Sequence, residues 1–166
     1  MIKDTIEIQG VPTIELYDAN GRLKQSLTEK NLIVKTGKNY FLRKAFDQFN
    51  SGSEPALEVV AVGSGTTTPT IDDTSLESQF DSSTVDSYSF LADNEIVLLT
   101  GFIQGVGTGT INELGLLATD GTLISRIVVS QSFEKTATDF LNVNWRFTIG
   151  DINSYVQSGY VQNGYV

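Results

Sequence analysis

The chain has 166 residues, a net charge of −9 and neither cysteine nor histidine. This composition excludes disulfides, zinc sites built on thiolates, and imidazole as a general base or metal ligand. No apolar run is long enough to cross a membrane as a helix, and the first residues lack the apolar segment of a signal peptide. The length favours one domain with a substantial core.

The charges are unevenly distributed along the sequence. Eight of the eleven basic residues lie in the first 44 positions, whereas residues 45–125 contain twelve acidic residues and no basic one. An acidic surface repels phosphate backbones, so we expect no binding to nucleic acid. The acidity is interpreted either as a solubility feature or as one side of a polarised molecule whose basic N-terminal part faces an acidic partner.

The N-terminal third predicts a hairpin, a short strand and a helix. Residues 13–17 and 22–27 alternate around an Asp-Ala-Asn-Gly turn, and residues 31–34 form a third strand. A helix is expected from Gly37 to Phe49, with the hydroxyl of Thr36 as its N-cap. Its apolar stripe is interpreted as core rather than as a ligand slot, and it consists of Phe41, Leu42, Ala45, Phe46 and Phe49.

The middle of the chain alternates strands with glycine-containing loops. Residues 57–62 predict a strand, and residues 72–76 predict a helical turn capped by an Asp. Residues 88–91 and 95–104 predict two further strands, of which the second is apolar on both faces and is expected to be central in its sheet. The intervening Gly-Ser-Gly at 63–65 lacks the third glycine of a dinucleotide loop and the lysine of a P-loop, which argues against phosphate binding.

The C-terminal half predicts the centre of the core. Residues 111–117 and 123–129 flank an Asp-Gly pair, which is a strong hairpin signal. The last strand, 141–149, alternates strictly and contains the only tryptophan. One face carries Leu141, Val143, Trp145, Phe147 and Ile149. The predicted core residues are Trp145, Val143, Phe147, Phe41 and Phe46.

These elements predict a mainly β fold, an antiparallel, jelly-roll-like β-sandwich with one packed α-helix. We expect residues 1–151 to form a single domain that includes the N-terminal hairpin. Residues 152–166 form a separate, uncharged segment with three Tyr-Val pairs five residues apart.

The Tyr-Val segment has two interpretations. It is either a strand that folds back on its own domain or, as we favour, an arm that packs on a neighbouring subunit. Tyrosine suits an arm because it supplies contact area together with a polar hydroxyl group. The predicted interface residues are Tyr155, Val156, Tyr160, Val161 and Tyr165.

We expect no catalytic, cofactor-binding or metal-binding residues. Ser64 as a nucleophile would need a lysine base, and no lysine lies between Lys44 and Lys135. The acidic residues Asp72, Asp73 and Asp81 do not match a calcium loop and are interpreted as surface solvation. Paired carboxylates for glycoside hydrolysis stay open, because their separation is a spatial quantity. Glu113 is expected to pair across strands with Lys135 or Arg126, and a surface pair would add under about 1 kcal/mol.

Several segments in fixed order resemble a β-sandwich module of tailed-bacteriophage virion proteins. The resemblance covers roughly residues 13–149, and it rests on residues 31–37, 60–69, 73–76, 111–117, 121–126, 133–135 and 143–145. Such modules occur in tail-fibre or baseplate components and in small capsid decoration proteins. The resemblance implies structure and assembly and supplies no catalytic residues.

Three functions follow as hypotheses. The favoured one is a capsid decoration (cement) protein, which stabilises the shell by binding the major capsid protein and copies of itself. This hypothesis implies a homo-oligomer, with a trimer as one option, located on the capsid surface after synthesis in the host cytoplasm, with no nucleic-acid or membrane partner. A short domain without a long shaft favours it over the second hypothesis, a tail-fibre, baseplate or host-adsorption module. The third is a carbohydrate-binding or hydrolytic β-sandwich.

Overall fold

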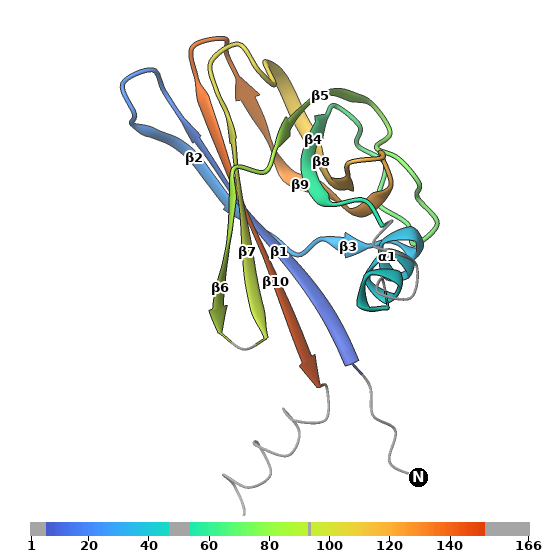
Figure 1. The fold of residues 1–166 in the computed structure, drawn as a ribbon. Helices are drawn as coiled ribbons and strands as arrows, with labels where there is room; N and C mark the ends of the chain where they lie inside the picture. Colours follow the sequence, from blue (N-terminus) through green and yellow to red (C-terminus); the bar gives the residue numbers. More distant parts are fainter. Residues whose placement is uncertain (1–5, 47–53, 93, 152–166) are drawn as a thin grey trace, which may run out of the picture.

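The computed structural model describes residues 6–46, 54–92 and 94–151, which form two antiparallel five-stranded sheets and one helix (Figure 1). The sheets pack face to face, and their facing side chains make the main core. The predicted fold class, a mainly β sandwich with one packed helix, is confirmed.

The first sheet has the order β2-β1-β10-β7-β6 and the second has the order β3-β9-β8-β4-β5. The strands of the first sheet are β1 (Ile6–Tyr17), β2 (Leu23–Thr28), β6 (Ser87–Ala92), β7 (Glu95–Phe102) and β10 (Phe140–Asp151). Those of the second are β3 (Leu32–Ile33), β4 (Leu57–Gly63), β5 (Gln79–Thr84), β8 (Gly109–Ala118) and β9 (Leu123–Lys135). The helix α1 spans Lys35–Ala45.

The predicted hairpins β1–β2 and β8–β9 are confirmed, but two strands differ from the prediction. Strand β1 starts at Ile6 and pairs with β10 along its whole length. Strand β5 was not predicted, because its sequence is polar and only partly covered. Residues 72–76 form no helix, and the carboxylate of Asp73 instead accepts hydrogen bonds from the amide and the hydroxyl of Thr70.

Strand β10 is the middle strand of the first sheet, and its inward face is the centre of the core. Leu141, Val143 and Trp145 are completely buried, and Phe147 is 4 % exposed. Ile149 on the same face is 50 % exposed, contrary to the prediction. In Figure 1 the lower ends of β1, β10, β7 and β6 extend past the strands of the second sheet, which therefore does not cover Ile149.

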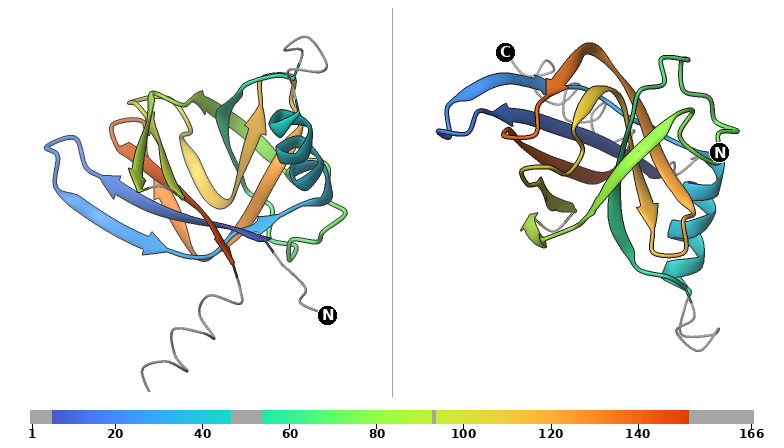
Figure 2. Two further views of the ribbon diagram at one scale, coloured as in Figure 1. Left: turned by 60° about the horizontal axis from the view of Figure 1, so that its bottom comes forward. Right: turned by 90° about the horizontal axis from the view of Figure 1, so that it is seen from above.

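Helix α1 lies along one side of the second sheet (Figure 2) and contacts β9. The hydroxyl of Thr36 donates to the carbonyl of Leu123 on β9, so the predicted N-cap role is wrong. The buried helix residues are Gly37 and Tyr40. A Cβ atom at Gly37 would overlap the backbone carbonyl of Ile124, so this glycine lets the helix backbone approach the sheet closely.

This close approach turns part of the predicted apolar stripe away from the core. Phe46 is 57 % exposed, so its assignment to the core is wrong, and Leu42 is exposed as well. Phe41 is partly buried and meets Phe147 edge to face, with 5.9 Å between the ring centroids. Phe49 lies outside the described residues. Helical spacing identified an apolar stripe, but glycine and tyrosine determined which face meets the sheet.

We expect Trp145→Ala to lower the free energy of unfolding by about 3–5 kcal/mol, because it leaves a cavity at the centre of the core. The matched variant Phe46→Ala should change it by under about 0.5 kcal/mol, because this ring is largely in solvent. Both values are measured by urea denaturation. Similar losses for the two variants would contradict the placement of the core.

Candidate functional site

Four of the seven motif segments meet in one cluster of charges on the outer face of the second sheet, namely 60–69, 73–76, 111–117 and 121–126. This buried charged cluster consists of Glu113 on β8, Arg126 on β9, and Asp73 and Glu77 in the loop between β4 and β5. The Glu113 side chain is completely buried and that of Arg126 is 3 % exposed. Nε of Arg126 donates to Oε2 of Glu113 at 2.9 Å, and its Nη1 donates to Oδ2 of Asp73 at 2.7 Å.

The Glu113 carboxylate also accepts three backbone amides from the β4–β5 loop. Oε1 accepts from Gly65 at 3.2 Å and from Ser78 at 2.7 Å, and Oε2 accepts from Glu77 at 3.1 Å. With the guanidinium of Arg126, this buried carboxylate has four donors. A charge without water needs such partners, so Glu113 fixes both ends of the loop to the sheet.

The glycines at the start of this loop are explained by the same carboxylate. A Cβ atom at Gly63 would lie 2.5 Å from Oε1 of Glu113, and a Cβ atom at Gly65 would lie at the same distance from that oxygen. Any larger residue at either position would displace the carboxylate. The Gly-Ser-Gly segment therefore makes room for a protein carboxylate, which agrees with the sequence argument against a phosphate loop.

The loop carboxylates complete the cluster around Arg126. Burial alone would raise the pKa of Asp73, but the hydrogen bonds from Thr70 and Arg126 outweigh it and lower that pKa. The amide and hydroxyl of Thr67 lower the pKa of Glu77, whose Oε2 lies 3.7 Å from Nη2 of Arg126. Burial opposes the charge of Arg126, yet hydrogen bonds to Asp73 and Glu113 raise its pKa. These pKa shifts favour the ionised forms of Asp73, Glu77 and Arg126, and the two carboxylates pair with Arg126.

Of the two predicted partners of Glu113, Arg126 and Lys135, the structure shows one. Arg126 is the partner, but the pair is buried rather than on the surface, because the β4–β5 loop covers it. Lys135 is also buried and donates to the carbonyl of Ile103 at 3.1 Å. Burial lowers the pKa of Lys135, and the charges of Asp139 and Asp81 partly oppose this shift.

Two of the three acidic residues assigned to surface solvation have structural partners instead. Asp73 pairs with Arg126, which corrects that assignment, and Asp81 accepts the amide of Gly107 at 2.6 Å. Asp72 is exposed, as a solvated residue would be. Sequence reasoning missed Glu77, and no local pattern marks it, because its approach to Arg126 depends on the path of the β4–β5 loop.

A second buried charge, Asp139, links the two sheets at the turn between β9 and β10. Its Oδ2 accepts Nζ of Lys24 on β2 at 2.8 Å and the amide of Thr136 at 2.8 Å. The bond from Lys24 is the main cause that lowers the pKa of Asp139 to about 2, with Thr136 assisting against burial. Neither partner of Asp139 was predicted from the sequence.

Metal sites and surface grooves are two further kinds of candidate site. Among residues 6–46, 54–92 and 94–151, no group of three acidic residues is placed to hold a metal ion, and no helix is long and apolar enough to cross a membrane. Three surface grooves lie elsewhere, and none is lined by a residue of the buried charged cluster. The groove on the outer face of the first sheet has no aromatic side chain on which a sugar ring could stack.

The structure describes the predicted core residues of β10 but not the predicted interface residues. Trp145, Val143 and Phe147 lie together in the core. The predicted interface residues of the Tyr-Val segment lie outside the described residues, namely Tyr155, Val156, Tyr160, Val161 and Tyr165. Comparison with family models, curated proteins and solved structures finds no match to this chain.

We expect Arg126→Met to lower the free energy of unfolding by about 3–5 kcal/mol, because it leaves the Glu113 carboxylate buried without its cation. The control is Arg146→Met, which removes a largely exposed pair with Glu95 and should cost under about 1 kcal/mol. Chemical denaturation at pH 7 measures both. Equally small losses of unfolding free energy in the two variants would show that solvent reaches the buried charged cluster.

We expect Asp139→Asn to lower the free energy of unfolding at neutral pH by an amount that disappears in acid. The folded pKa of about 2 lies below the ordinary value near 4, so ionised Asp139 stabilises the fold fully above that value. The contribution, up to about 2–3 kcal/mol, is lost as the pH falls through the folded pKa. The stability difference between wild type and variant should therefore be constant above about pH 5 and shrink toward pH 2. Thermal unfolding across this range measures it, and a difference independent of pH would contradict the assignment.

Proposed function

We propose that this chain is a structural virion protein of a tailed bacteriophage and acts as a capsid decoration protein. In this role it stabilises the shell by binding the major capsid protein and copies of itself. The observation that carries the proposal is the convergence of the resembling segments. Residues 63–67, residues 73–77, Glu113 and Arg126 are far apart in the sequence and contact one another in one cluster.

This convergence gives each of the segments in the cluster a structural task. The glycines leave space for Glu113, Glu113 holds the loop amides, and Arg126 neutralises the buried carboxylates. Leu76 of the same loop is 5 % exposed and packs in an apolar cluster on the outer face of the second sheet. The residues of the resembling segments thus hold the fold together, which supports a likeness of fold to the virion modules. It also supports a structural role rather than catalysis.

The surface chemistry supports assembly with an acidic partner. Helix α1 carries Lys35, Lys38, Arg43 and Lys44 with no acidic residue in its first turn, although the chain as a whole has a net charge of −9. Leu42 and Phe46 are exposed on the same helix. A basic surface with exposed apolar side chains favours contact with an acidic protein surface, such as a capsid subunit would present.

Immunogold electron microscopy tests the location. Antibodies raised against the purified protein are applied to particles released by cells that carry the gene. Labels distributed over the capsid are the expected result. Labels confined to the tail would replace the decoration role by a tail-fibre or baseplate role, and particles without any label would overturn the proposal.

We expect a chain truncated after Asp151 to keep its melting temperature and to bind the capsid more weakly. The ten described strands lie between Ile6 and Asp151, whereas the Tyr-Val pairs are the predicted contact with neighbours. The measurements are thermal unfolding and re-binding to particles stripped of the protein. A truncated chain that loses its fold, with binding unchanged in the folded fraction, would show that the segment is part of the domain.

A further inference from the structure

The first sheet has an uncovered apolar surface at the end where it extends past the second sheet. This apolar shelf consists of Ile8 on β1, Ile149 and Phe147 on β10, Ile96 on β7 and Phe90 on β6. Strand pairing sets Ile8 opposite Ile149, Phe147 opposite Ile96, and Ile96 opposite Phe90. Residues paired in this way point to the same side of a sheet, so the shelf continues the core face outward.

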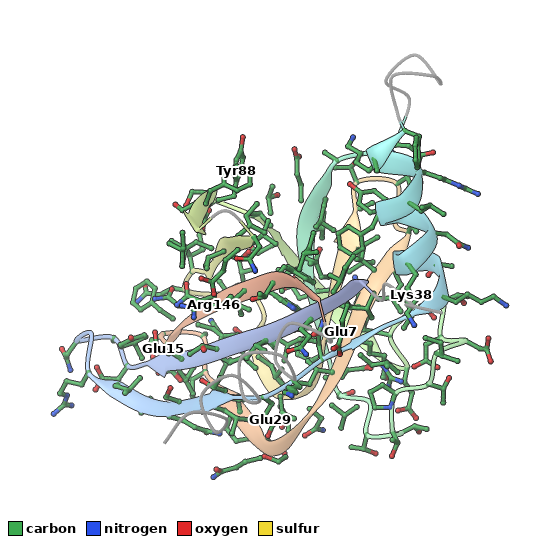
Figure 3. The ribbon with its side chains drawn as sticks, turned by 90° about the horizontal axis from the view of Figure 1, so that it is seen from below. Glu7, Glu15, Glu29, Lys38, Tyr88 and Arg146 are labelled. Atoms are coloured by element: carbon green, nitrogen blue, oxygen red, sulfur yellow. The ribbon has the colours of Figure 1, made fainter. Side chains whose placement is uncertain are left out.

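The shelf is exposed at its outer end although its residues are of core type, and its inner residue Phe147 is buried. Phe90 is 75 % exposed and Ile149 is 50 % exposed, whereas Trp145 on the same face is completely buried. Such a contiguous apolar surface is typical of an interaction site. Figure 3 views this end of the molecule, with Tyr88 on β6 at one side and Lys38 on α1 at the other.

The shelf has the shape and chemistry of a peptide groove. Between the shelf and the side chains of Phe41 and Leu57 lies a groove of about 230 Å³, whose polar lining residues are Asn94 and Glu95. This volume is below the roughly 300 Å³ at which small-molecule sites begin, and it suits one or two inserted side chains. A second groove of about 740 Å³ shares Ile8, Phe41 and Ile149 and extends the surface along α1.

The Tyr-Val segment matches this groove in composition. Residues 152–166 carry no charge and contain three Tyr-Val pairs. An apolar groove penalises charges and accepts aromatic rings, while the rim at Asn94 and Glu95 offers hydrogen-bond partners to a tyrosine hydroxyl. The segment follows directly on β10, which carries Ile149 of the shelf.

The length of the segment favours the groove of another copy. Along β10 the shelf runs from Ile149 back to Phe147, two residues or about 7 Å. Fifteen extended residues reach about 50 Å, which is several times that distance. The direction of β10 also leads the chain off its own shelf, and only residues 152–154 precede Tyr155 for a reversal. The segment is therefore long enough to reach a neighbouring subunit. Binding to the shelf of its own chain would occupy only a small part of it.

We propose that the apolar shelf of one copy binds the Tyr-Val segment of a neighbouring copy. The proposal rests on the proposed function, in which copies contact one another on the shell, and it names that contact. A tyrosine ring enters the groove between Phe90 and Phe41, and the adjacent valine packs on Ile149. Each subunit both donates a segment and receives one, so the contact joins copies in series or in a closed ring.

Cysteine cross-linking tests the contact, because the natural chain has no cysteine. Two full-length variants, Phe90→Cys and Tyr160→Cys, are purified, mixed and oxidised. A disulfide-linked heterodimer is expected, at least about tenfold in excess of that formed when Leu99→Cys replaces Phe90→Cys. Leu99 is the matched control, because it is exposed on the outer face of the same sheet. Equal yields from the two mixtures would overturn the proposal.

The double variant Phe90→Cys/Tyr160→Cys separates the two possible donors. Oxidised dimers and larger species on a non-reducing gel support a neighbouring copy. A bond within one chain, seen as a monomer that loses two hydrogens in mass, would show that the segment covers its own shelf and would overturn the proposal.

Substitutions that form no cross-link test the contact independently. Phe90→Ser should raise the concentration at which the purified oligomer dissociates by about tenfold or more, and Leu99→Ser should leave it unchanged. Both side chains are exposed, so neither variant is expected to unfold, and circular dichroism checks this. An oligomer that is unaffected by Phe90→Ser, or a wild type that is monomeric in sedimentation at high concentration, would count against the contact.

These experiments use purified protein without particles, so they fail separately from the proposed function. A heterodimer through Phe90, together with unlabelled capsids, would keep the shelf contact and remove the decoration role. Labelled capsids together with a bond inside one chain would keep the role and remove the shelf contact.

Discussion

The carboxylate of Glu113 is the constraint on which the outer half of the molecule depends. It lies on the outer face of β8, where the loop between β4 and β5 covers it and excludes water. Three loop amides and the guanidinium of Arg126 replace that water. Glycine at 63 and 65 follows from this, because no other residue leaves room for the oxygen atoms. One buried charge thereby specifies the path of the loop from β4 to β5.

Such a cluster specifies a structure more than it stabilises one. Desolvation of Glu113 and Arg126 opposes their attraction, so the pair as a whole contributes little compared with an apolar replacement of the same shape. Removal of one partner is costly, because the other stays buried and charged. We infer that the cluster selects a single arrangement of the loop. Leu76 of that loop then packs against Leu117 and Leu123 and covers the outer face of the second sheet.

The sequence predicted those features that are set by nearby residues. Strict alternation located β10, and the Asp-Gly pair located the β8–β9 hairpin. Features that depend on contacts between distant segments were not predicted. Arg126 was one of two predicted partners of Glu113, yet its burial by the loop was not visible in the sequence. The rotation of α1 depended on the fit of Gly37 to Ile124. The shelf was missed for a related reason, because Ile149 alternates as Trp145 does and only the length of the facing sheet distinguishes them.

The cluster and the shelf are connected through α1. The β4–β5 loop continues from Glu77 back to Ile71, whose carbonyl accepts the amide of Lys35 at 2.8 Å, at the first residue of the helix. The helix in turn places Phe41 against Phe147, where it forms one wall of the groove. A loosened cluster would therefore release the start of α1 and, with it, that wall. The contacts that hold the loop therefore also support the start of α1 and one wall of the groove.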